Sequence, residues 1–305
     1  MPERAALTID DILVAFKESE GIYEREMVDA AIERQVEIVP RLIALLRDVI
    51  DSPDDYLEKE DRLDHLYALM LLGYFEATEA HDTIVDLFSQ PDELPHEIFG
   101  EIATDHLPDI LLRTCGGALD RIKAMARDRQ VDAYCRSSAL LALSFAVAKG
   151  TAARDDIVAF IGGLFTGNEA EKDSDFWSFA AEIAAELYPE ENMAIIEKAF
   201  ADGLISETIV SYDDIQSFMV RGKDETFAHL KTKYDSFALN DIHASMSWWA
   251  CFQEGMDWTV PSAPTDLFTS PLYPLPEATL KKKSTKEKKK KRKQTQSAKR
   301  KNRRR

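Results

Sequence analysis

Apolar residues recur at the spacing of a single helix face along most of this chain. From Phe176 to Leu187 they stand at positions i, i+3, i+4, i+7, i+8 and i+11, which is typical of an amphipathic helix. A second stripe runs from Ile157 to Phe165. Alternation with a period of two is hard to find, and no Asn-Gly or Asp-Gly turn joins two β-branched runs. The pattern predicts an all-α protein.

The expected helices come in pairs. Their ranges are 63–74 with 78–88, 95–106 with 116–127, 132–148 with 152–165, and 174–187 with 190–201. The pairs begin roughly 32–42 residues apart, which is typical of helical-repeat arrays. Because one pair cannot bury its apolar face alone, neighbouring pairs must stack. Residues 138–148 are apolar nearly all round, as expected for a helix covered on two sides. Gly162-Gly163 lies in an apolar helix and is expected to allow close helix packing.

Short helices are expected to cap the array over the first 50 residues. Proline fits the first turn of a helix, so Pro40 is predicted to begin one. Pro53 is predicted to end that helix, and the acidic residues after it would open the next at its positive end.

The net charge of −17 is the average of two unlike parts. Residues 281–305 hold 16 basic residues and one acidic residue, whereas the first 280 hold 22 basic and 54 acidic residues, a net charge of −32. Five of the 12 prolines fall between Pro261 and Pro276. We therefore expect a helical body over 1–260, an extended proline-rich strap over 261–280 and a disordered basic tail over 281–305.

Composition points to the cytoplasm. The three cysteines are widely spaced and form no CxxC pair, so neither a disulfide framework nor a thiolate zinc site is indicated. The N-terminus lacks the apolar core of a signal peptide. The longest uncharged runs span only 12 residues, where a membrane-spanning helix needs about 20. Nuclear targeting in a host cell by the basic tail is the alternative location.

One segment carries a family resemblance. Residues 68–80 have a small-rich helix that ends near Leu72-Gly73, followed by a short turn and by Glu79-Ala80, and with residues 84–88 they resemble a HEAT-like repeat. Together with Met246–Phe252 and the proline-rich segment, the body resembles an uncharacterised bacterial family, domain of unknown function 1186. The resemblance implies a HEAT-like α-solenoid of stacked hairpins. Some relatives carry a C-terminal zinc motif, but its cysteine pattern is absent here, so no zinc is expected.

No pattern of catalytic residues emerges. There is no HExxH, GxSxG, GxGxxG or Walker motif, and the single His96-Glu97 dipeptide is too little for a HEAT-like di-iron site. We expect structural or surface roles for the histidines: His65, His81, His96, His106, His229 and His243. Cys251 is expected to be buried and inert. No cofactor or metal site is predicted, and a metal-dependent enzyme is kept only as the least favoured alternative.

Two groups of residues are candidates for contact with a protein partner. Glu97, Glu101 and Asp105 would form an acidic row if they lie on one helix, which is either a solvated face or a site for a basic partner. The aromatic cluster of Trp248, Trp249, Phe252 and Trp258 either packs the last helix or lines a peptide groove.

The tail is the candidate site for a polyanion. Its basic residues include Lys288, Lys289, Lys290, Lys291, Arg292, Lys293, Arg303, Arg304 and Arg305. No aromatic residue lies between them, so contact with nucleic acid would be sequence-blind and sensitive to salt. Three roles for the tail stay open: binding to the acidic body, contact with RNA or the ribosome, and targeting or contact with an anionic membrane. The favoured hypothesis is a non-enzymatic scaffold whose acidic helical surface binds a protein or peptide.

Overall fold

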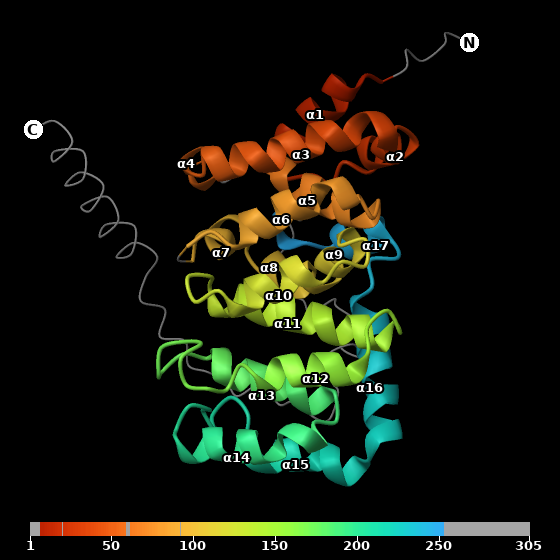
Figure 1. Cartoon of the computed structure of the whole chain (residues 1–305). Coiled ribbons are helices and arrows are strands. Elements are labelled where there is room, and N and C mark those ends of the chain that lie inside the picture. Colours follow the sequence, from red (N-terminus) through yellow and green to blue (C-terminus); the bar gives the residue numbers. More distant parts are fainter. Residues whose placement is uncertain (1–6, 20, 59–61, 92, 253–305) are drawn as a thin grey trace, which may run out of the picture. The chain divides into compact units, whose positions relative to one another are not determined.

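Helices make up the regular structure of the described chain. The computed structural model describes residues 7–19, 21–58, 62–91 and 93–252 (Figure 1). Within these ranges every regular element is a helix, apart from an isolated antiparallel bridge between Pro91 and Val131. The all-α prediction is confirmed for this part of the chain. No described helix is long and apolar enough to cross a bilayer.

The helices are short, and most end at a glycine or a polar turn. The α-helices are α1 Ile9–Lys17, α2 Arg25–Glu33, α3 Gln35–Asp51, α4 Asp54–Leu57, α5 Asp64–Tyr74, α6 His81–Phe88, α7 Leu94–Phe99, α8 Ile102–Asp105, α9 Leu107–Thr114, α10 Asp120–Arg127, α11 Ala133–Ala148, α12 Arg154–Gly162, α13 Phe176–Glu186, α14 Met193–Ala201, α15 Tyr212–Arg221, α16 Lys223–Phe237 and α17 Ile242–Met246. The described residues also contain three 3₁₀ turns: η1 Thr78–Ala80, η2 Glu190–Asn192 and η3 Ala250–Phe252.

Successive helices pack on one another in chain order. Helix α3 packs against α5, α5 against α9, α9 against α11, α11 against α13, and α13 against α15. Every residue of α5 from Asp64 to Gly73 is buried, and α11 is covered by α9, α10, α13 and α16. The apolar character of α5 and α11 on all sides therefore follows from their position between neighbours.

Side-chain caps set several helix starts. Thr8 and Ser211 each form a reciprocal capping box with the aspartate three residues later. Asp132 accepts hydrogen bonds from the backbone N–H groups of Tyr134 and Cys135 at the start of α11. These oxygens pair with N–H groups that have no partner inside the helix.

The prediction of one helix over residues 95–106 is wrong. The chain breaks at Gly100, whose φ of +58° ends α7, and restarts as α8. The prediction for 116–127 begins too early, because Gly116 and Gly117 have positive φ values and α10 starts at Asp120. Helix α9 between them was not predicted.

The prediction that Pro40 begins a helix is also wrong. It lies within α3, which starts at Gln35. Pro40 has no backbone N–H, so α3 lacks one hydrogen bond at this position. The burial of Val39 and Leu42 on either side offsets this loss. Pro53 does mark the end of α3 and the start of α4, as predicted.

Of the pair Gly162-Gly163, Gly162 allows the expected close packing. A Cβ on Gly162 would lie 2.5 Å from the side-chain oxygen of Asn192, so only glycine fits there. Asn192 in turn donates from Nδ2 to the carbonyl of Val158 at 2.7 Å. The absent side chain thus lets η2 approach α12.

The end of the described chain returns across earlier helices. We call residues 239–252 the return segment. It follows α16, which packs against α11, α13 and α15, and its helix α17 packs against α5 (Figure 1). The expected strap over 261–280 and tail over 281–305 lie outside the described residues.

Candidate functional site

Two members of the predicted aromatic cluster, Trp249 and Phe252, pack in the core. The Phe252 ring lies 5.4 Å from the rings of both Tyr23 and Tyr67, and it stacks on Trp249 at 6.0 Å. Trp249 and Phe252 are only 8% and 7% exposed, so they are not open to a peptide. Trp248 differs, because 60% of it is exposed. Trp258 lies outside the described residues.

A hydroxyl, an imidazole and a carboxylate line up where the return segment meets α2. His243 lies 2.9 Å from the Tyr23 hydroxyl through Nδ1 and 2.9 Å from Asp29 Oδ1 through Nε2. Since the carboxylate can only accept, Nε2 donates to it and Nδ1 of the neutral ring accepts from Tyr23. Burial raises the pKa of Tyr23, which keeps the phenol protonated and a poor nucleophile. The trio therefore attaches α17 to α2.

Other histidines are also engaged in packing. His65 donates from Nε2 to the carbonyl of Ile98 at 3.1 Å, and His81 Nδ1 lies 3.0 Å from the Thr114 hydroxyl. His106 packs on Trp249 at 5.7 Å, and burial lowers its pKa to about 4. The described residues contain no group of three His, Cys, Asp or Glu side chains placed to hold a metal ion.

Cys251 is less buried than predicted. It is partly buried next to the Phe252 cluster, and burial raises its pKa to about 11. The thiol is thus protonated at neutral pH, and a protonated thiol is neither a nucleophile nor a metal ligand.

The acidic row does not lie on one helix. Glu97 belongs to α7 and Asp105 to α8, with Glu101 at the break between them. All three are exposed. Although Asp105 is exposed as a residue, partial burial of its carboxyl and then the charge of Glu101 raise its pKa. Glu97 lines a cleft.

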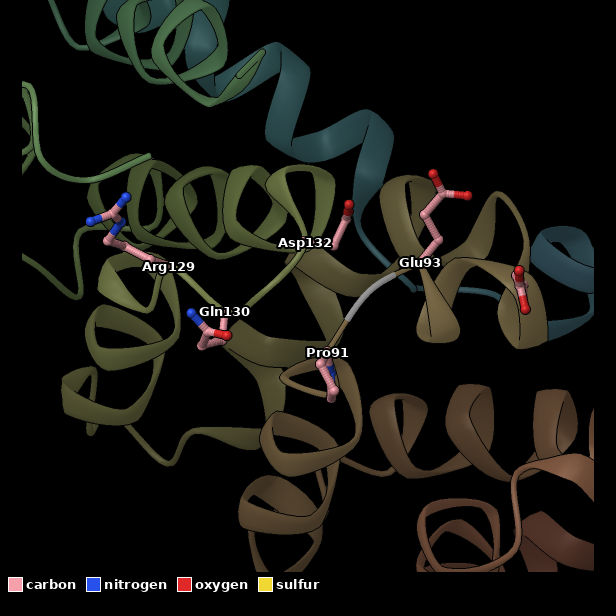
Figure 2. Close-up of a pocket in the computed structure, with 6 residues that line it drawn as sticks. Pro91, Glu93, Arg129, Gln130 and Asp132 are labelled. Carbon is pink, nitrogen blue, oxygen red and sulfur yellow. The ribbon is translucent and has the colours of Figure 1, made fainter. Parts of the chain in front are cut away.

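That cleft is an open polar hollow of about 490 Å³. Figure 2 shows its lining, which comes from the start of α7 and from the loop between α10 and α11: Pro91, Glu93, Glu97, Arg129, Gln130 and Asp132. The bridge between Pro91 and Val131 joins the two loops. Arg129 donates to Glu171 at 3.0 Å, so its charge is compensated by a residue outside the lining. Three carboxylates dominate the lining itself.

Three aromatic rings from three helices adjoin this cleft. Tyr134 on α11, two residues beyond Asp132, is 46% exposed. Its ring lies 6.3 Å from that of His96 on α7 and 5.1 Å from that of Phe179 on α13. We call these three side chains the aromatic shelf. Sequence reasoning missed it, because residues 96, 134 and 179 share no local pattern.

Comparison with known proteins places the chain in a family. The model of a family described as "Protein of unknown function (DUF1186)" matches residues 7–253. The chain belongs to the DUF1186 family. The match takes in the described helices and stops before the proline-rich segment, so the DUF1186 region is the part that carries the cleft and the return segment.

Relatives of this DUF1186 protein occur in Chlamydia. An uncharacterized protein of Chlamydia trachomatis serovar D is 31% identical over 214 residues, which is 70% of this chain and 84% of the relative. An uncharacterized protein of Chlamydia muridarum is 31% identical over 214 residues, 70% of this chain and 85% of the relative. No solved structure matches this DUF1186 protein.

The basic residues of the tail have no structural description. Lys288–Lys293 and Arg303–Arg305 lie outside both the described residues and the family match. The prediction that they contact a polyanion therefore stays a prediction about a segment attached to the DUF1186 region.

Proposed function

We propose that this DUF1186 protein is a non-enzymatic cytoplasmic scaffold, built as a HEAT-like α-solenoid, that binds a basic protein or peptide. The packing of α3, α5, α9, α11, α13 and α15 in chain order supports the repeat architecture. The net charge of −32 over the first 280 residues supports a basic partner, since opposite potentials steer association.

The observation that carries the proposal is the cleft lined by Glu93, Glu97 and Asp132. It lies at the start of α11, whereas α16 packs its rings Tyr234 and Phe237 on Phe145, near the other end of α11. Because α16 packs near the other end of α11, it leaves the cleft uncovered within the described part of the chain. Carboxylates in an open hollow attract cations and cost little desolvation.

A binding experiment with defined peptides tests the scaffold proposal. Fluorescence anisotropy would measure binding of a Lys/Arg-rich peptide to the full chain at 50 and 300 mM salt, with an acidic peptide of equal length as control. We expect binding of the basic peptide that weakens at least tenfold at the higher salt. Equal binding of both peptides, or no effect of salt, would remove the electrostatic proposal.

A second function rests on the tail. Sixteen basic residues within residues 281–305 suit contact with RNA or the ribosome. Ribosome co-sedimentation would compare the full chain with a variant in which the cations from Lys288 to Lys293 are replaced by Gln. We expect the variant to sediment less. Equal sedimentation would count against the tail as a polyanion-binding segment.

A further inference from the structure

We propose that the aromatic shelf and the adjoining cleft form a docking site for an extended partner segment with alternating arginines. The inference rests on the proposed scaffold function and names the partner chemistry. It starts from Tyr134, whose large exposed ring contributes little to the core. Exposed tyrosine in a patch with other rings is typical of an interface anchor.

The rings favour a flat cation. A guanidinium group stacks on aromatic faces and is more weakly hydrated than an ammonium group, so arginine gains more here than lysine. His96, Tyr134 and Phe179 come from α7, α11 and α13, so the shelf crosses three helices in sequence. A partner that follows the shelf would run across these helices rather than along one of them.

Carboxylates surround the same rings. Asp132 caps the helix that carries Tyr134 and lines the cleft with Glu93. Burial and then the charges of Asp175, Asp132 and Glu93 raise the pKa of Tyr134. In Figure 2 the side chains of Glu93 and Asp132 point to the same side of the loop that carries Pro91. A carboxylate can accept two parallel hydrogen bonds from one guanidinium group. An arginine at this place would therefore meet an exposed ring and negative charge together.

The spacing of the rings in the aromatic shelf favours a partner segment with an arginine at every second position. Their centroids follow one another at 6.3 and 5.1 Å. In an extended chain, side chains two residues apart lie on one face at about 6.6 Å. An Arg-x-Arg-x-Arg segment would present its arginines at nearly this interval, whereas three consecutive arginines would point to alternate sides.

The test uses the full chain and three peptides of equal length and charge. One carries Arg-Ser-Arg-Ser-Arg, the second carries the same residues as an Arg block followed by a Ser block, and the third replaces Arg by Lys in the alternating order. Isothermal titration calorimetry at 100 mM salt would give each Kd. We expect the alternating arginine peptide to bind at least threefold more tightly than either of the others.

Variants locate the site. Tyr134→Ala should weaken the alternating arginine peptide about fivefold, and Tyr134→Phe should retain binding because the ring stays. Asp132→Asn should also weaken it, since asparagine still caps α11 but lacks the charge. Glu197→Gln is the matched control, because it removes one exposed carboxylate on α14, away from the shelf.

The outcomes separate the two proposals. Binding of all basic peptides with equal affinity, unchanged in Tyr134→Ala and Asp132→Asn, would overturn the docking site and leave the scaffold proposal standing. An equal loss in Glu197→Gln would also overturn the site, because the attraction would then be spread over the whole surface. Binding of none of the peptides would overturn both.

Discussion

Asp109 on α9 accepts a hydrogen bond from the backbone N–H of Leu239 at 2.7 Å, across 130 positions of sequence. Asp109 is 1% exposed, and its second oxygen has no hydrogen-bond partner among the described residues. The contact lies where the return segment leaves α16. A buried carboxylate at this point ties the end of the helical region to its middle.

Replacing Asp109 tests the importance of this contact. Asp109→Ala leaves the Leu239 N–H buried without an acceptor, so we expect a loss of about 2–3 kcal/mol in the free energy of unfolding. Asp109→Asn keeps a carbonyl oxygen and should lose less. Urea unfolding followed by circular dichroism would measure both. Asp156→Ala, an exposed change on α12, is the control and should stay within about 0.5 kcal/mol of the parent. A similar loss in that control would refute the role of Asp109.

Replacing the adjacent residues Trp248 and Trp249 should change the free energy of unfolding by very different amounts. Trp249 is buried against His106 and Phe252, so Trp249→Ala should cost about 3–5 kcal/mol of unfolding free energy. Trp248→Ala removes a ring that is 60% exposed and should cost less than about 1 kcal/mol. Thermal unfolding of both variants would measure the difference. Comparable losses would mean that the return segment does not pack as described.

The protein should lose stability in mild acid because the buried His106 ring becomes protonated. Its folded-state pKa of about 4 lies below the ordinary value of 6.5, so the unfolded chain binds the proton more tightly. This stability is therefore complete above pH 6.5 and is lost as the pH falls toward 4, by roughly 2–3 kcal/mol. His106→Phe keeps a ring against Trp249 but cannot titrate. From pH 7 to pH 4 the urea midpoint of the parent should fall more steeply than that of His106→Phe, and parallel curves would contradict the assignment.

Replacing the neighbouring residues Gly162 and Gly163 by alanine should affect stability differently. Gly162→Ala places a methyl group against Asn192 and strains its hydrogen bond to Val158, so we expect a loss of about 1–3 kcal/mol. Gly163 has helical dihedral angles, and its nearest contact from an added Cβ is an ordinary 3.4 Å. Gly163→Ala should be neutral or stabilising by up to about 1 kcal/mol. Differential scanning calorimetry would compare the variants, and a destabilised Gly163→Ala would show that the packing argument is misplaced.

Local patterns predicted the helices with the most apolar sequences. Helices α5, α6, α11 and α13 lie within a few residues of their predicted ranges, because an apolar face or a wholly apolar helix can be recognised within one segment. The break at Gly100 was missed, since one glycine within a run of helix formers does not show whether the chain will turn there.

The sequence alone determined the all-α class of the described residues and the opposite net charges of residues 1–280 and 281–305, because periodicity and charge are local properties. Only the tertiary structure decided which of the candidate residues are exposed. It buried Trp249 and Phe252, left Trp248 open, separated Glu97 from Asp105, and brought His96, Tyr134 and Phe179 together. Such contacts join residues tens to hundreds of positions apart. They depend on how complete helices pack against each other, and no short sequence window contains that information.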